Sequence, residues 1–340
     1  MADILKSIDP VEAERFSPLG SSPLIVLDLA DRGAESRARC LSSSTRAIII
    51  GVDFAGSSPA LDPQSFDCLI SAAPGAPQPW VAVAPAFIKD RAAGIAAAIA
   101  DAPHAASALC AVLRIGELQP FDNALMLESL AYSMLLGGQE FGRWRAAHPP
   151  PIAQPTDQPY VSVERSEDQV TLTLSRPDTR NAMSAGMRDA LFDALAAILV
   201  DPTEPKLLLK ARGACFSTGG DLAEFGTARD LAQAHHIRTL RSCATLLHDL
   251  GDRAEVLLHG ACIGSGIEIP AAAARRCAKK GTFVQLPELS MGLIPGAGGT
   301  VTLSRAIGRH RTCYMALTGQ RIPAPIASAW GLLHSIESEA

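Results

Sequence analysis

The 340-residue chain has few aromatic side chains and no excess of basic charge. Phe, Trp and Tyr together make up 5% of its residues, and the formal net charge is −5. Proteins that bind nucleic acid combine clustered Lys and Arg with aromatic rings that stack on bases. The composition therefore predicts no nucleic-acid partner.

The sequence also lacks any close pairing of its cysteines. No two of them form a C-x-x-C pair, and they lie at Cys40, Cys68, Cys110, Cys215, Cys243, Cys262, Cys277 and Cys313. Zinc knuckles and redox motifs need such pairs, so we expect no metal site. Scattered cysteines are typical of buried free thiols in a reducing compartment.

Long apolar runs are missing as well. No uncharged apolar segment approaches the roughly 20 residues that a membrane span needs. The N-terminal sequence MADILKSIDPVEAERF has no apolar core of the kind found in secretion signals. We therefore expect a cytoplasmic protein with no membrane partner.

A glycine-rich stretch, LPELSMGLIPGAGGT (286–300), has the composition of a phosphate-binding loop but not its pattern. A P-loop needs a Lys after its last glycine, whereas Thr300 follows Gly299. The dinucleotide fingerprint needs a third glycine where Val301 stands. We interpret the stretch as a tight turn that leads into a helix.

A proline-rich segment, AAHPPPIAQPTDQP (146–159), predicts an extended linker between two parts of the chain. The first part, residues 1–150, reads as strands followed by helices. We expect its strands at 22–30, 46–54 and 79–85, and its helices at 91–116 and 122–148.

The second part, residues 160–340, alternates strands and helices, which indicates a largely parallel sheet covered by helices. We expect strands within 160–177 and at 206–213, helices at 184–201 and 229–251, and a strand, turn and helix over 254–276. Ser184 is the predicted N-cap of its helix.

Two glycine-rich turns follow buried strands of the second part, CFSTGGDL (215–222) and HGACIGSGIEI (259–269). Ligands of open α/β sheets bind at the carboxyl ends of the strands, and glycine lets the backbone approach them. Paired N–H groups at these turns would form an oxyanion hole.

Two carboxylates accompany these turns. Glu268 lies in the apolar segment IEIPAAAA, and Glu288 follows 20 positions later among apolar residues. A carboxylate is costly to bury unless it has a partner or a function, so a paired structural role for Glu268 stays open. Near an oxyanion hole, two such groups are suited to proton transfer beside a thioester or ester carbonyl.

Residues 160–335 resemble the crotonase (enoyl-CoA hydratase/isomerase) superfamily. The matching motifs are SRPDTRNAMS (175–184), ACFSTGGDLAEFG (214–226), HGACIGSGIEIPAAAA (259–274), FVQLPELSMGLIPGAGGTVTLSRAIG (283–308), ALTGQRI (316–322) and AWGLL (329–333). The resemblance implies an α/β fold, the crotonase-like ββα spiral of repeated β-β-α units in stacked sheets covered by helices. Residues 1–150 would be an additional α/β segment that ends in helices.

The same resemblance implies roles for individual residues. The N–H groups of Gly220 and Ser265 would form the oxyanion hole, and Glu268 and Glu288 would be the catalytic pair of a hydratase. Ser265 stands where family members often have Gly, and its side chain would narrow the pocket. Further implied contacts with the substrate and its CoA are Arg180, Ala182, Ser217, Thr218, Gly219, Asp221 and Leu222.

The resemblance implies an acyl-CoA substrate, no separate cofactor, and a homo-oligomer such as a trimer or hexamer. The helices that close the acyl pocket in the family would lie beyond Ala340. We expect residues 91–150 to supply them, as in a circular permutation or a degenerate duplicated unit.

Alternatives stay open for the reaction and for one helix. An enoyl-CoA isomerase or another enolate-forming enzyme, such as a cofactor-free oxygenase, would use a single glutamate, and a non-catalytic acyl-CoA-binding protein would need neither. His235 and Arg238 are either solvated or packed side chains, or they meet a polar acyl tail.

Overall fold

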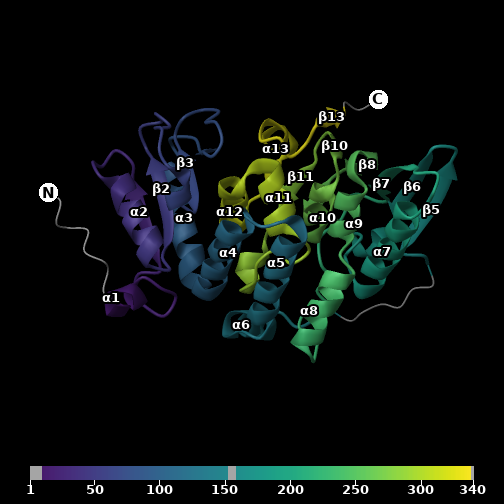
Figure 1. Cartoon of the computed structure of the whole chain (residues 1–340), viewed down its shortest axis with the longest axis horizontal. Coiled ribbons are helices and arrows are strands. Elements are labelled where there is room, and N and C mark those ends of the chain that lie inside the picture. The colour runs from purple at the N-terminus through teal and green to yellow at the C-terminus, as the bar shows by residue number, and fades with distance from the viewer. Residues whose placement is uncertain (1–9, 152–157, 338–340) are drawn as a thin grey trace.

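A computed structural model describes residues 10–151 and 158–337, and the two parts of the chain lie side by side along its long axis (Figure 1). The first part carries one sheet, and the second carries two (Figure 1). The predicted linker, 146–159, overlaps the end of the last helix of the first part, which reaches Ala147, and its other residues precede the first strand of the second part. Its residues 152–157 lie outside the described residues, and 148–151 form no helix or strand.

The sheet of the first part has four parallel strands in chain order, β1 (Leu24–Asp28), β2 (Ile48–Asp53), β3 (Cys68–Ser71) and β4 (Val81–Ala82). Both faces of β2 are buried. Ile49 packs in a small cluster that also contains Ala38 of α2 (Ala34–Ser44), whereas Ile48 and Ile50 belong to the main core. Three strands were predicted; β3 was missed because its apolar run is only four residues long.

Besides α2, the helices of the first part are α1 (Pro10–Arg15), α3 (Ile88–Asp101), α4 (Pro103–Gly116), α5 (Phe121–Leu136) and α6 (Gln139–Ala147). Each of the two predicted helices is therefore divided in two. Pro103 begins a new helix because its ring excludes the preceding turn and its missing N–H costs nothing at a first position. Gly137 and Gly138 separate α5 from α6.

Among the described residues, no single helix is long and apolar enough to cross a membrane. The pair α3 and α4 passes the same test of length and composition only when both are taken together, and they are bent by 108°.

The second part builds a six-stranded and a three-stranded sheet. The larger has the order β13-β10-β8-β7-β6-β5, and the smaller has the order β12-β11-β9. The strands are β5 (Val161–Ser166), β6 (Gln169–Leu174), β7 (Lys206–Ala211), β8 (Ala254–Leu258), β9 (Ala261–Ile263), β10 (Arg275–Lys279), β11 (Phe283–Gln285), β12 (Ile322–Pro323) and β13 (Ser335–Glu337). Consecutive strands β8 and β9, and then β10 and β11, pass from the larger sheet to the smaller one. This is the ββα arrangement that the resemblance implies.

The helices of the second part are α7 (Ala185–Leu199), α8 (Leu231–Leu240), α9 (Cys243–Asp249), α10 (Ser265–Glu268), α11 (Gly299–Ile307), α12 (Arg309–Thr318) and α13 (Ala324–Ala329). Ser184 caps α7 as predicted, because its hydroxyl accepts from the Met187 N–H at 3.2 Å. The predicted helix 229–251 is two helices, since Ser242 caps a new one. The helix expected within 254–276 is a single turn followed by a short 3-10 turn that begins at Pro270.

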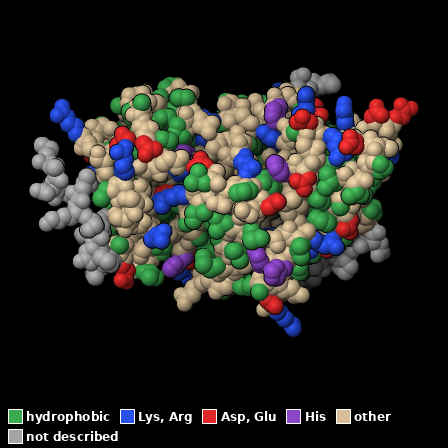
Figure 2. Space-filling model, viewed as in Figure 1, with side chains coloured by type: hydrophobic (Ala, Val, Ile, Leu, Met, Phe, Trp, Pro, Cys, Tyr) green, Lys and Arg blue, Asp and Glu red, His purple; other side chains and the backbone are tan. Residues whose placement is uncertain are grey.

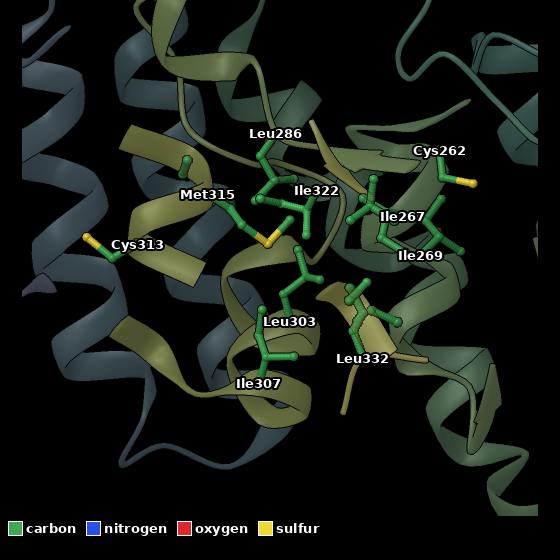
Figure 3. Packing of buried hydrophobic residues seen from close by; sticks show 14 of the residues in the cluster. Cys262, Ile267, Ile269, Leu286, Leu303, Ile307, Cys313, Met315, Ile322 and Leu332 are labelled. Carbon is green, nitrogen blue, oxygen red and sulfur yellow. The ribbon is translucent and has the colours of Figure 1, made fainter. Parts of the chain in front are cut away.

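The two parts share one hydrophobic core. The buried residues of α11 and α12 that Figure 3 shows belong to the same cluster as Ile50 of β2. Cys313 of α12 points toward the helices of the first part, where the Cys110 sulfur lies 3.8 Å away (Figure 3). The fully buried Arg309 of α12 donates to the Phe66 carbonyl at 2.7 Å. All eight cysteines are free thiols, and all except the half-buried Cys40 are buried.

Candidate active site

A cavity of about 420 Å³ lies between the two parts of the chain. One wall is α5 of the first part, and α8 forms another. The opposite wall is made of the turns that follow β7, β9 and β11 together with the loop before α11. The cavity brings together the four residues predicted for the chemistry, Gly220, Ser265, Glu268 and Glu288.

The predicted oxyanion donors stand at two of these turns. The segment around Gly220 is held by Met183, whose N–H donates to the Gly219 carbonyl at 2.8 Å and whose carbonyl accepts from the Asp221 N–H at 3.2 Å. Position 219 needs glycine, because its φ is 91° and a Cβ would lie 2.9 Å from the Ile263 oxygen. Among the described residues, the Gly220 and Ser265 N–H groups donate no hydrogen bond. Both donors are therefore available to a ligand.

The two predicted carboxylates line the cavity and approach each other beside Gly264. Glu268 ends the single turn α10, and Glu288 begins the 3-10 turn Glu288–Met291. A Cβ added at Gly264 would lie 2.7 Å from Glu288 Oε1 and 3.7 Å from Glu268 Oε1. One oxygen of each carboxylate therefore lies close to Gly264, where a side chain would collide with Glu288.

The glycine-rich loop at 296–300 holds Glu268 in place. The Oε2 atom of Glu268 accepts from the Ala297 N–H at 2.8 Å and from the Gly299 N–H at 3.0 Å. The loop is the turn into a helix that was predicted, since α11 begins at Gly299. The N–H groups of this loop bind side-chain carboxylates of the protein itself.

A third buried carboxylate, Glu128 of α5, binds the alternate N–H groups of the same loop. Its Oε1 accepts from the Gly298 N–H at 2.7 Å, and its Oε2 accepts from the Thr300 N–H at 2.8 Å and from the Thr300 hydroxyl at 2.6 Å. Sequence reasoning missed this residue. The criterion that singled out Glu268, a carboxylate set among apolar residues, also applies to Glu128 in LMLESLAY and could have found it.

Burial raises the pKa of all three carboxyl groups. The pKa of Glu268 is raised to about 7, although the N–H groups of Ala297 and Gly299 favour its charged form. The pKa of Glu128 is raised to about 8 by burial and by the charge of Glu268. The pKa of Glu288 is raised well above its usual range by burial and by Glu268, and its Oε2 has no hydrogen-bond partner among the described residues. Burial without a donor at this oxygen favours the protonated form of Glu288.

The other predicted contact residues surround the Gly220 turn. Asp221 lines the cavity, and its carboxylate accepts from the Ala223 N–H at 2.9 Å. Ser217 is fully buried behind the turn, where its hydroxyl donates to the Asn181 carbonyl at 2.8 Å. The remaining predicted contact residues do not line the cavity. They are Ser217, Arg180, Ala182, Thr218, Gly219 and Leu222. Their contact with CoA stays a prediction.

No group of three or more His, Cys, Asp or Glu side chains in the described ranges is arranged to hold a metal ion.

Comparison with known proteins shows the family to which the chain belongs. The family model described as enoyl-CoA hydratase/isomerase matches residues 164–340. The chain is 31% identical over 177 residues to "Enoyl-CoA isomerase/hydratase fer4" of Mycosarcoma maydis, covering 48% of this chain and 64% of that protein. It is 33% identical to a trans-2-decenoyl-[acyl-carrier-protein] isomerase of Streptococcus mutans, covering 49% of this chain and 65% of that protein.

A solved enoyl-CoA hydratase structure from Thermoplasma volcanium is 30% identical, with a TM-score of 0.48 over 53% of this chain and 72% of that chain. The chain spans less than two thirds of the length of the two curated relatives above. Because the family model matches more than half of its residues, the chain belongs to the enoyl-CoA hydratase/isomerase family.

Proposed function

We propose that this protein is an acyl-CoA enzyme that adds water across the 2,3 double bond of an enoyl-CoA thioester. The observation that carries the proposal is the convergence, in one cavity, of two available backbone donors and two facing carboxylates. Donors and carboxylates in this combination serve reactions in which charge develops on a carbonyl oxygen while a proton moves nearby.

In the proposed reaction, the thioester oxygen accepts hydrogen bonds from the N–H groups of Gly220 and Ser265. Negative charge builds on this oxygen as the enolate forms, so the donors bind the transition state more strongly than the substrate. One such donor typically lowers the barrier by about 3–4 kcal/mol.

The two carboxyl groups take different roles because their environments differ. Glu268, which accepts two N–H bonds, is the base that removes a proton from water as the water oxygen bonds to C3. Glu288, which has an oxygen without a partner, is the acid that delivers its proton to C2. Glu268 gains one proton and Glu288 loses one, and a proton must return to Glu288 before the next turnover.

The test is the loss of conjugated thioester absorbance with crotonyl-CoA. Glu268→Gln and Glu288→Gln should each lower kcat by about 10²–10⁴-fold, the usual contribution of a positioned acid or base. Glu255→Gln, on the exposed side of β8, is the control and should keep full activity. Wild-type protein that turns over no short-chain, branched, aromatic or carboxylate-ended enoyl-CoA would refute the proposal.

The same variants distinguish the alternatives. An isomerase would produce conjugated absorbance from a 3-enoyl-CoA and would lose activity with only one of the two substitutions. A non-catalytic binding protein would bind these ligands with no turnover in either assay.

The pH dependence provides a second test. Glu268 must be ionised, and its pKa is raised to about 7, so kcat/KM should fall as the pH drops below that value. Glu288 must be protonated and has a pKa well above its usual range, so activity should persist on the alkaline side. A carboxyl group with an ordinary pKa is already ionised at pH of about 5. A kcat/KM that stays constant between pH about 5 and 7 would therefore contradict the role of Glu268.

A further inference from the structure

Three arginines line the cavity, and one of them differs from the other two. Arg188 pairs with Asp189 at 2.9 Å, and Arg241 pairs with Asp193 at 2.9 Å. Arg238, on α8, forms no ion pair with any carboxylate of the described residues. It is a half-buried cation that lacks a counterion in direct contact.

The guanidinium of Arg238 is held in a defined position by α5. Its Nη1 donates to the hydroxyls of Ser129 and Ser133 at 2.9 and 3.0 Å, and it lies 3.3 Å from the Ser129 carbonyl. The guanidinium carbon lies 4.5 Å from the centre of the Tyr132 ring. Ser129 is further oriented by His235, whose Nδ1 is 2.9 Å from the same hydroxyl.

The opposite edge of this guanidinium is unused. Nε and Nη2 of Arg238 donate no hydrogen bond among the described residues. These two nitrogens form the side of the guanidinium that matches both oxygens of a carboxylate. The molecule uses this edge elsewhere, because Arg114 binds both oxygens of the buried Asp67 through Nε and Nη2.

No carboxylate of the described residues takes the place of such a partner for Arg238. Burial lowers the pKa of Arg238, and Glu128 opposes this effect through its charge. The oxygens of Glu128, however, accept from Gly298 and Thr300. A cation removed from water without a paired charge is destabilising, so a ligand that brings an anion would gain from meeting it.

Arg238 is also connected to the reacting groups. The Tyr132 ring beneath it packs on Gly296, where an added Cβ would lie 2.4 Å from the ring. The next residue, Ala297, donates to Glu268. Figure 2 shows charges of both signs interspersed over the visible face of the molecule.

We propose that the cavity selects acyl-CoA ligands whose acyl chain ends in a carboxylate, bound side-on by Nε and Nη2 of Arg238. The inference rests on the proposed function for one point, that the thioester lies at Gly220 and Ser265. Arg188 and Arg241 do not compete for the terminal carboxylate, because Asp189 and Asp193 already neutralise them.

The experiment measures binding, by titration calorimetry, of saturated acyl-CoA pairs of equal chain length that end in a carboxylate or in a methyl group. Hydrogen bonds to charged groups are each worth a factor of about 10 to 100 in affinity, and the wild type should prefer the carboxylate by this factor. Arg238→Met should abolish the preference by weakening only the carboxylate ligand. Arg238→Lys, which keeps the charge but loses the planar edge, should retain part of it.

The control is Arg165→Met, on β5, where Arg165 pairs with Asp201 on the surface. It should leave the preference unchanged, which excludes a general effect of net charge. Circular dichroism melting checks that each variant is folded, and the wild-type preference tests the proposal even if Arg238→Met does not fold.

Equal affinity of the wild type for both ligands would overturn the inference. So would an equal loss for both ligands, or for CoA alone, in folded Arg238→Met, because Arg238 would then serve the fold or the CoA phosphates. Saturated ligands need no turnover, so a protein that fails as a hydratase can still show this selectivity, and the two proposals fail separately.

Discussion

The two facing walls of the cavity are built in different ways. One wall presents backbone N–H groups and the ends of short turns, at Gly220, Ser265 and Glu288. The other is one face of α5, a 16-residue helix that presents side chains, including Glu128, Ser129 and Tyr132. The first wall contains the proposed chemistry, and the second orients it, since Glu128 holds the loop that also holds Glu268. The difference teaches that the first part of the chain belongs to the site as well as to the core.

Removing residues 1–150 should have the largest effect, because it deletes the α5 wall and exposes the core face that Ile48 and Ile50 share with the second part. We expect insoluble or unfolded protein, measured by solubility and circular dichroism. A soluble and active fragment 151–340 would show that the second part needs no partner wall. It would also refute the prediction that residues 1–150 supply missing capping helices.

Gly264→Ala should displace the Glu288 carboxylate. The new Cβ would lie 2.7 Å from Glu288 Oε1, and the backbone φ of 51° disfavours any side chain. A displaced catalytic group commonly costs about 100-fold in rate, and we expect a loss of this size in kcat. Gly281→Ala is the matched control, because Gly281 has a φ of 82° but, apart from its chain neighbours, no described residue has an atom within 4 Å of its Cβ position. Similar activity of both variants would show that the contact with Glu288 is unimportant.

Glu128→Gln should distinguish the positioning of Glu268 from the stability of the fold. Glu140, on α6, is a matched buried carboxylate that accepts from the N–H groups of His104 and Ala105 at the start of α4 and is not part of the cavity lining. Either substitution weakens hydrogen bonds to buried donors and should cost about 1–3 kcal/mol in the free energy of unfolding. Only Glu128→Gln should also lower kcat/KM, by about 10- to 100-fold, because its loop positions Glu268.

Chemical denaturation and crotonyl-CoA kinetics on the two variants test this difference. If Glu140→Gln lowers kcat/KM as much as Glu128→Gln does, the α5 wall has no special connection to the reaction.

Ser265→Ala should have the smallest effect. The Ser265 hydroxyl is buried without a hydrogen-bond partner, and the proposed contribution of this residue is its backbone N–H. Removing an unpaired hydroxyl is close to neutral, so kcat/KM should change by less than about fivefold. A larger loss, measured with the same enoyl-CoA substrate, would assign a role to the side chain that the first wall does not need.

The short motifs of the second part were predictable because each is local. The Gly219–Gly220 turn, the pair Ser265 and Glu268, and Glu288 each follow a strand closely in sequence, and the ββα arrangement brings successive strand ends together. Helix ends were less predictable: Pro103 and Ser242 each start a new helix inside a segment whose apolar pattern continues across the break. A continuous apolar face does not reveal where the backbone turns.

The sequence motifs indicated the family and the strands β7 and β8, whereas β9 and β11 were not predicted. The resemblance to the family implied the four residues that lie at the cavity, because the motifs that carry them are short and local. Only the tertiary structure decided what closes the cavity. Glu128 and Thr300 are 172 positions apart, and neither residue predicts the other. The same holds for Arg238 and its partners on α5, Ser129 and Ser133. These contacts arise because α5 packs against both α8 and α11, and this packing brings polar groups from distant parts of the chain together.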